Sequence, residues 1–106
     1  TGQLLAYSLA AVRAQPATAK DGRVVASFTT ADGLDLMTAA SDGTLYFGGS
    51  GGTLYVVSPN GAVKTLANGW PGIRGVALDA ANRRLFVAVT AARADGPASI
   101  RIVPFD

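Results

Sequence analysis

The sequence predicts an all-β chain, organised as a β-propeller segment of about two and a quarter four-stranded antiparallel blades. Two observations predict this fold. The first is composition: 49% of the 106 residues are hydrophobic, 15% are charged and 13 are glycine, which suits short buried strands joined by tight turns. The second is an internal repeat of about 40 residues with four strands in each unit, a period typical of propeller blades.

The repeat is clearest between residues 36–47 and 76–87, which align at an offset of 40. Each copy contains an apolar strand, a polar turn and a second apolar strand that opens with Leu and an aromatic residue. No window of the sequence repeats its apolar residues at the helical period of about 3.6. The two copies therefore predict the first and second strands of successive blades.

The third and fourth strands of the units follow in the same order. Third strands are predicted at 2–8, 52–58 and 99–103, and fourth strands at 23–28 and 62–66. Each fourth strand comes after an Asp-Gly or Asn-Gly pair, Asp21-Gly22 or Asn60-Gly61. Such pairs readily adopt the positive φ angles of tight hairpin turns. Residues 9–19 predict a long hairpin loop with room for one helical turn, because Pro16 would end a longer helix.

The predicted strands divide the chain into three parts. Residues 1–33 form the end of one blade, 34–72 form a full blade, and 73–106 supply three strands of a last blade. Nine strands cannot close a propeller, which needs four or more blades. We therefore expect the remainder of the propeller to come from a second chain, a cleaved fragment or symmetry copies. The alternative is a nine-stranded sandwich that folds alone.

Composition also excludes several classes of function. The chain has no Cys and no His, which removes disulfides, thiolate metal sites and the commonest general base, and all seven acidic residues are Asp. The net charge of +2 comes from scattered Lys and Arg, so no nucleic-acid-binding patch is predicted. No apolar run approaches the roughly 20 residues that span a bilayer, so no membrane partner is predicted either. The cellular compartment stays open.

Several motifs go beyond a generic repeat. They are Ala31-Asp32-Gly33-Leu34, Ser41-Asp42-Gly43-Thr44-Leu45-Tyr46, Gly51-Gly52-Thr53-Leu54 and Arg84-Leu85-Phe86-Val87-Ala88-Val89-Thr90-Ala91-Ala92-Arg93. In this order and spacing the chain resembles the last third of the regucalcin/gluconolactonase family of six-bladed propellers. The resemblance covers nearly all of the chain. It rests on Asp-Gly motifs that other propeller families share.

The resemblance implies a metal site and a reaction. Propellers of this family hold a divalent cation, often Ca²⁺, at one mouth of the central channel, and Asp32 matches the Asp of their "Pro-Asp-Gly" motif. Ala31 stands where the family usually has Pro, and the other ligands would lie outside this chain. The implied function is metal-dependent hydrolysis of a lactone or similar ester by the assembled propeller, with Asp32 as ligand and catalytic base. Without the resemblance, the sequence favours a turn residue at Asp32, because Asp before Gly commonly bonds a backbone N–H two residues on.

Candidate pocket residues for a small-molecule substrate share that mouth. They are Trp70, Arg74 and Arg93, near Ser50, Thr90 and Asp95. Trp70 either stacks on a substrate ring or fills the gap between two blades, and Arg74 either binds an anionic group or forms a surface ion pair. Four further polar residues, Asp21, Asp42, Asn60 and Asn82, are predicted to stabilise turns. The alternative function is a non-catalytic propeller that serves as a binding or interaction module.

Overall fold

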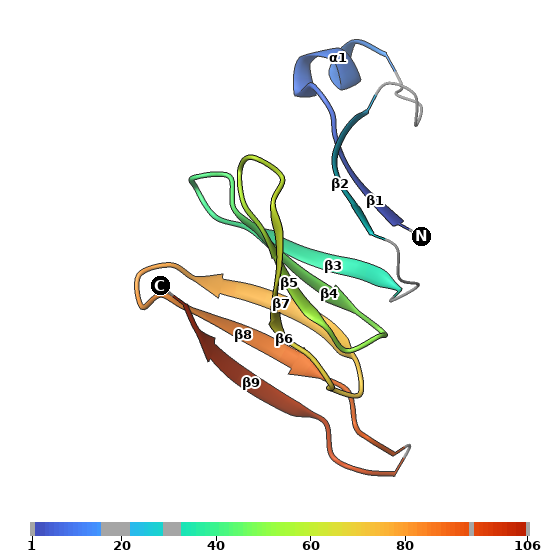
Figure 1. Cartoon of the computed structure of the whole chain (residues 1–106), viewed down its shortest axis with the longest axis vertical. Helices are drawn as coiled ribbons and strands as arrows, with labels where there is room; N and C mark the ends of the chain where they lie inside the picture. The colour runs from blue at the N-terminus through green and yellow to red at the C-terminus, as the bar shows by residue number, and fades with distance from the viewer. Residues whose placement is uncertain (1, 16–21, 29–32, 94, 106) are drawn as a thin grey trace.

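The computed structural model describes residues 2–15, 22–28, 33–93 and 95–105. Over these ranges the chain forms nine strands and one short helix, and every paired strand is antiparallel. The all-β prediction is therefore confirmed. The strands form three separate sheets that follow one another in chain order (Figure 1).

Each sheet is a simple meander in which neighbouring strands are consecutive in sequence. The first sheet pairs β1 (Gly2–Ala6) with β2 (Arg23–Phe28). The second contains β3 (Leu34–Ala39), β4 (Leu45–Gly49), β5 (Leu54–Val57) and β6 (Val63–Ala67). The third contains β7 (Ile73–Asp79), β8 (Arg84–Val89) and β9 (Ser99–Pro104). In the described residues the sheets thus have two, four and three strands.

The connection between β1 and β2 contains a helix, α1 (Leu9–Ala14), where the sequence predicts a loop with one helical turn. Ser8 caps the helix, because its side-chain oxygen accepts a hydrogen bond of 3.3 Å from the backbone N–H of Ala11. Three of the six helical residues are alanine, the residue with the highest helix propensity. No residue of α1 is buried, so local capping and propensity account for this helix.

The strand pairing corrects the offset of the repeat in one place. Phe47 pairs with Met37 in the second sheet, and Val87, its counterpart 40 residues later, pairs with Val76. The first strands are therefore related by an offset of 39. Between equivalent paired residues, the β7–β8 hairpin has one residue more than the β3–β4 hairpin: six separate Leu78 from Leu85, and five separate Ala39 from Leu45. Within the longer hairpin, Arg83 has a positive φ of 53°. An alignment by hydrophobic pattern alone conceals this extra turn residue.

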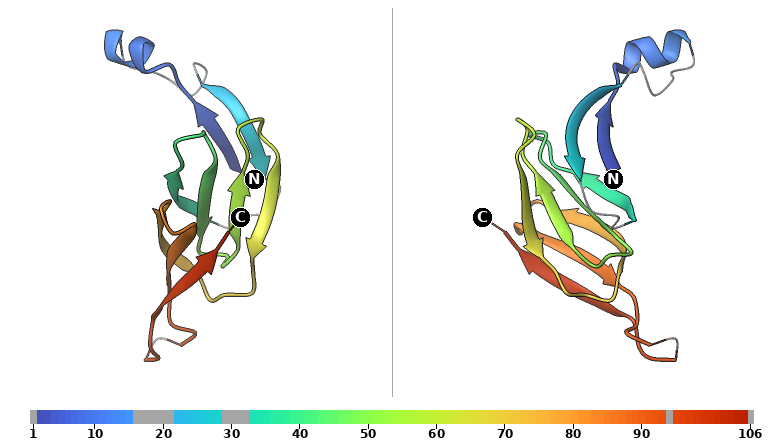
Figure 2. Two further views of the ribbon diagram at one scale, coloured as in Figure 1. Left: turned by 90° about the vertical axis from the view of Figure 1, so that its left-hand side faces the viewer. Right: turned by 45° about the vertical axis from the view of Figure 1, so that its right-hand side comes forward.

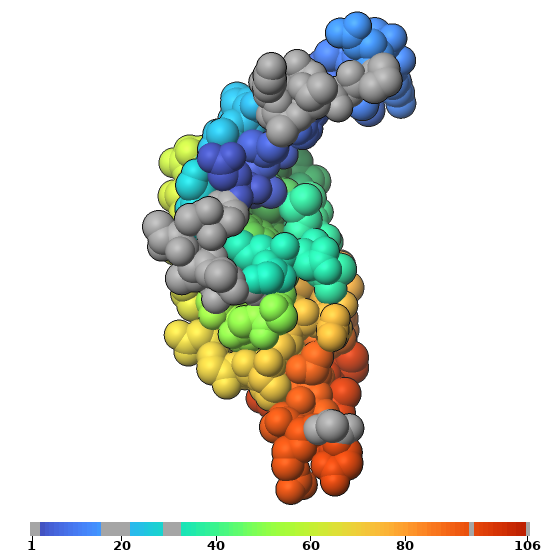
Figure 3. Space-filling model, turned by 90° about the vertical axis from the view of Figure 1, so that its right-hand side faces the viewer, coloured from blue at the N-terminus to red at the C-terminus, as the bar shows by residue number. Residues whose placement is uncertain are grey.

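Figure 2 shows how the sheets follow one another in the stack. Apolar side chains pack between neighbouring sheets. Between the first and second sheets, Phe28 meets Phe47 edge to face, with ring centroids 5.1 Å apart. Between the second and third sheets, the core residues are Tyr46, Leu54, Ile73, Leu85, Val87 and Val89. The stack is elongated, measuring 46 × 31 × 23 Å, with the N-terminal sheet at one end and β9 at the other (Figure 3).

Candidate functional site

Several loops of the second and third sheets gather at one end of the stack. They are residues 50–53 after β4, 68–72 after β6 and 90–98 after β8. The backbone N–H of Trp70 donates to the carbonyl of Gly52 (3.3 Å), and that of Thr90 donates to the carbonyl of Gly72 (2.9 Å). These bonds hold the loops against one another. We call this region, together with Gly33, the loop end.

Two glycines allow the close approach of these loops. Gly52 has a φ of +78°, and a Cβ atom there would overlap the carbonyl oxygen of Trp70. Gly33 has a φ of +58°, and a Cβ atom there would overlap the hydroxyl of Ser50. Glycine occupies the left-handed region at no steric cost. At Gly52 the close atoms belong to the backbone, so a side chain there would push the two loops apart, whereas at Gly33 rotation of the Ser50 hydroxyl would relieve the overlap. The packing of the loop end therefore depends most on Gly52.

Asp32, the predicted metal ligand and base, lies outside the described residues, as does Ala31. The next residue, Gly33, lies against Ser50, so the chain reaches β3 through the loop end. Among the residues that the structure describes, no three His, Cys, Asp or Glu side chains form a group that could hold a metal ion. Metal ligation by Asp32 stays a prediction.

Trp70 is half-buried and packs against the core between the second and third sheets. The guanidinium carbon of Arg101, on β9, lies 5.3 Å from the centroid of the indole ring. A cation at this distance is attracted to the ring face. In this conformation the ring joins two sheets, which agrees with the gap-filling role predicted for it. The contact with Arg101 was missed because it joins segments 31 positions apart in the sequence.

Arg74 lines an open depression of about 430 Å³ beside β8 and β9. Its other lining residues are Ala88, Val89, Thr90, Ala91, Ala98, Ser99 and Ile100. Arg74 is exposed, and it forms no ion pair with the described part of the chain. The structure thus places Arg74 in a pocket that Thr90 and Ser99 also line. The sequence analysis named Thr90 near this site but did not name Ser99.

Arg93 lies in the loop after β8. Its Nε is 4.0 Å from a carboxylate oxygen of Asp95, and the two side chains are 81% and 89% exposed. An ion pair this exposed contributes little to stability. Arg93 is not among the residues that line the depression beside Arg74, so these two candidate pocket residues do not share one described pocket.

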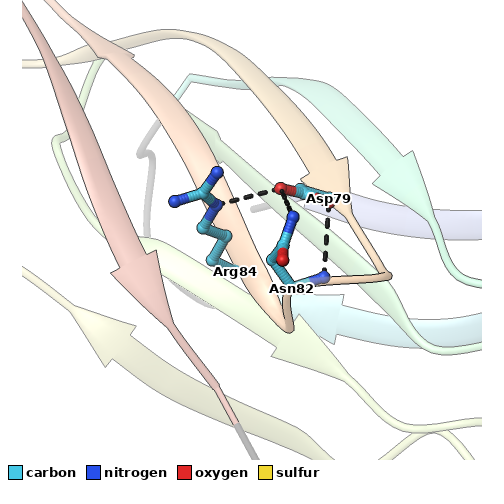
Figure 4. Close-up of polar contacts among 3 residues, drawn as sticks. All are labelled: Asp79, Asn82 and Arg84. Carbon is cyan, nitrogen blue, oxygen red and sulfur yellow. Dashed lines mark hydrogen bonds and ion pairs between the residues drawn. The ribbon is translucent and has the colours of Figure 1, made fainter.

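The opposite end of the stack carries hydrogen-bonded turns. A carboxylate oxygen of Asp42 accepts from the N–H of Thr44 (2.9 Å), and Asn60 accepts from the N–H of Ala62 (3.1 Å). Asp79 accepts from the Asn82 side chain (2.9 Å) and from Nε of Arg84 (2.9 Å), as Figure 4 shows. These bonds confirm the predicted turn-stabilising role of Asp42, Asn60 and Asn82. Asp21 lies outside the described residues.

The same turns shift the pKa values of two carboxylates, and burial shifts that of a tyrosine. The side-chain hydrogen bond from Asn82, followed by that from Arg84, holds the pKa of Asp79 below its usual value. The bond from the Thr44 backbone lowers the pKa of Asp42. Burial raises the pKa of Tyr46. Each shift follows from hydrogen bonds or burial at the positions described above.

We expect Asp79 to make the chain sensitive to acid. Its folded-state pKa is depressed, so its contribution is present above about pH 4, the ordinary Asp pKa, and is lost as the pH falls through the folded value. Asp79→Asn should reduce the stability lost between pH 7 and pH 3 in urea unfolding. Asp35→Asn removes another carboxyl and controls for net charge. If the Asp79→Asn variant loses as much stability between pH 7 and pH 3 as the unsubstituted chain, Asp79 is not a source of the acid sensitivity.

Comparison with known proteins identifies no relative: no family model, curated protein or solved structure matches the chain. In the described ranges, no helix has the length and apolar character needed to cross a membrane.

Proposed function

We propose that this chain is a segment of a β-propeller, and that the assembled propeller binds its ligand at the loop end. One observation carries the proposal. Successive antiparallel meanders stack face to face, and the loops after β4, β6 and β8 meet at a single end. In sheet proteins, binding residues are commonly held on such loops by a rigid scaffold. Ser50, Trp70 and Thr90 supply polar and aromatic groups there.

The reaction that we propose for this end is metal-dependent hydrolysis of a lactone or similar ester, as the family resemblance implies. Gly33, which follows Asp32 in the sequence, lies against Ser50 in the loop end. A bound Ca²⁺ or similar cation would polarise the ester carbonyl. Ca²⁺ takes six to eight oxygen ligands. Asp32 could supply only part of that set, so the remaining ligands would belong to the rest of the propeller.

The second candidate is a non-catalytic binding or interaction module. The depression beside Arg74 favours it, because five of its eight lining residues are alanine, valine or isoleucine. An apolar pocket with a few polar groups is typical of small-molecule binding sites. Arg74, Thr90 and Ser99 would orient the ligand without any reaction.

Calcium separates the two candidates. If Asp32 is a ligand, Ca²⁺ at about a hundred times its Kd should stabilise the assembled propeller by about 2.7 kcal/mol, measured by thermal unfolding. Asp32→Ala should abolish this gain and lactone hydrolysis together. Asp42→Ala, which removes a turn carboxylate at the opposite end, should leave the calcium response intact. A calcium response that Asp32→Ala leaves unchanged would refute the metal site, and ligand binding without hydrolysis would favour the binding module.

A further inference from the structure

One face of the third sheet is largely apolar and open to solvent, with the Asp79–Arg84 ion pair at its edge and the Arg84 guanidinium over the Phe86 ring. It carries Ala77, Phe86, Ala88, Ile100 and Ile102, which lie on the same side because they are neighbours in the β7–β8–β9 pairing. Ile100 and Ile102 are 66% and 56% exposed. The opposite side of this sheet holds Leu85, Val87 and Val89, which are buried against the second sheet. We call the exposed side the open face.

The same positions are buried in the second sheet. Tyr46 pairs with Val56 as Phe86 pairs with Ile102, and Leu54 corresponds to Ile100. Leu54 is 0% exposed and Tyr46 is 6% exposed, because the third sheet covers them. Large apolar residues therefore occupy equivalent positions on both faces, and in the described structure no sheet lies on the open face.

The first sheet contains a further copy of the position that Leu54 and Ile100 occupy. Leu4, which corresponds to Leu54 at an offset of 50, packs into the core between the first and second sheets. Leu4, Leu54 and Ile100 are thus three copies of one position. The next sheet covers the first two copies, and the third copy is exposed.

One contact by which the third sheet covers the second is made by the first residue of β7. Ile73, the first residue of β7, lies against Gly48, where an added Cβ atom would approach the Ile73 side chain to 2.5 Å. Leu34, the corresponding residue of β3, packs into the core between the first and second sheets. On the open face, the counterpart of Gly48 is Ala88, which carries the Cβ atom that Gly48 lacks, so a docked side chain would not repeat the Ile73–Gly48 contact. The depression beside Arg74, which is lined by Ala88 and Ile100, leaves room for an aliphatic side chain next to Ala88.

We propose that the open face is a docking surface for a further antiparallel sheet of the same repeat. The docked sheet places an aliphatic side chain of its first strand in the depression, beside Ala88 and against Ile100. This inference rests on the stacking geometry within the propeller proposal and is independent of any reaction at the loop end. Its test measures stability and not activity, so its failure is distinguishable from failure of the proposed hydrolysis.

A second copy of this chain is not the expected occupant, because its leading sheet, in residues 2–15 and 22–28 that the structure describes, has only β1 and β2 and lacks a first strand. Met37 shows how a missing first strand changes the burial of the next sheet. Met37 corresponds to Val76, which packs into the core between the second and third sheets. Met37 itself is 57% exposed, because the first sheet has no first strand to cover it. The occupant must therefore begin with a first strand of the β3 or β7 kind.

The experiment is an extended chain in which a copy of residues 61–106 directly follows Asp106. The junction is Asp-Gly, the same kind of turn pair as Asn60-Gly61. The addition supplies a fourth strand for β9 and a further sheet that begins with a copy of Ile73. We expect a higher unfolding midpoint than in the unextended chain, and shielding of the Ile100 and Ile102 methyl groups from a paramagnetic probe in NMR.

Ile100→Lys in the original copy provides the control. In the unextended chain it replaces an exposed side chain and should leave the unfolding midpoint unchanged. In the extended chain it should lower the folding equilibrium constant about tenfold or more, because it buries an unpaired charge. Equal effects in both chains, no gain on extension, or methyl groups that stay accessible would overturn the proposal. So would a dimer of the unextended chain that Ile100→Lys dissociates, since a second copy would then occupy the face.

Discussion

Leu54→Ala is expected to destabilise the chain by about 2–5 kcal/mol, which is the usual range for removing a buried leucine side chain. Leu54 is fully buried between the second and third sheets, where Ile73 and Leu85 belong to the same core. Its loss leaves a cavity that two stacked sheets cannot close without disturbing both. The free energy of unfolding, measured in urea, reports the change. Since small domains are stable by only about 5–15 kcal/mol, the effect is large.

Ile100→Ala is the matched control for this prediction. Ile100 occupies the equivalent position in the third sheet but is 66% exposed, so its truncation should change the stability of the isolated chain by less than about 0.5 kcal/mol. Similar losses in the two variants would contradict the assigned burial. They would also remove the contrast between covered and open faces on which the docking surface depends.

Gly52→Ala should be comparably damaging, at about 3 kcal/mol or more, for two additive reasons. A residue with a Cβ atom pays about 1–2 kcal/mol in the left-handed region, and Gly52 has a φ of +78°. The new methyl group would also overlap the carbonyl oxygen of Trp70, and such overpacking typically costs about 1–3 kcal/mol. Thermal unfolding of the purified variant measures the combined loss.

Gly69 separates the two contributions. It has the same φ of +78°, but nothing lies within 4 Å of a Cβ atom built there. Gly69→Ala should therefore show only the conformational cost of about 1–2 kcal/mol. If Gly52→Ala and Gly69→Ala lose the same stability, the contact between the loops of residues 50–53 and 68–72 does not constrain the loop end.

The strands of this chain could be predicted from its sequence because their signals are local. Glycine at Gly43 and Gly61 marks turns that require positive φ angles, and the apolar runs between them are too short for helices. The offset of β7 relative to β3 could not be predicted in the same way. It depends on one extra turn residue, which Arg83 accommodates in a left-handed conformation that a sequence pattern does not reveal.

The loop end was predicted in outline, since an antiparallel meander places alternate loops at the same end. The contacts within it were not. Trp70 meets Arg101 across two sheets, and Gly52 meets Trp70 through backbone atoms alone, so neither contact leaves a motif in the sequence. Asp32 was singled out by family resemblance, and its position lies outside the described residues.

The division of the apolar interior into two layers has a consequence for how the chain unfolds. The layer around Phe28 and Phe47 shares no residue with the layer around Leu54 and Val87. In stacked architectures of this kind, each unit is stabilised mainly by its immediate neighbours. The N-terminal hairpin has a neighbour on one side alone, so it should detach while the remaining strands stay folded. A single melting temperature would then describe an average over events that are only loosely cooperative.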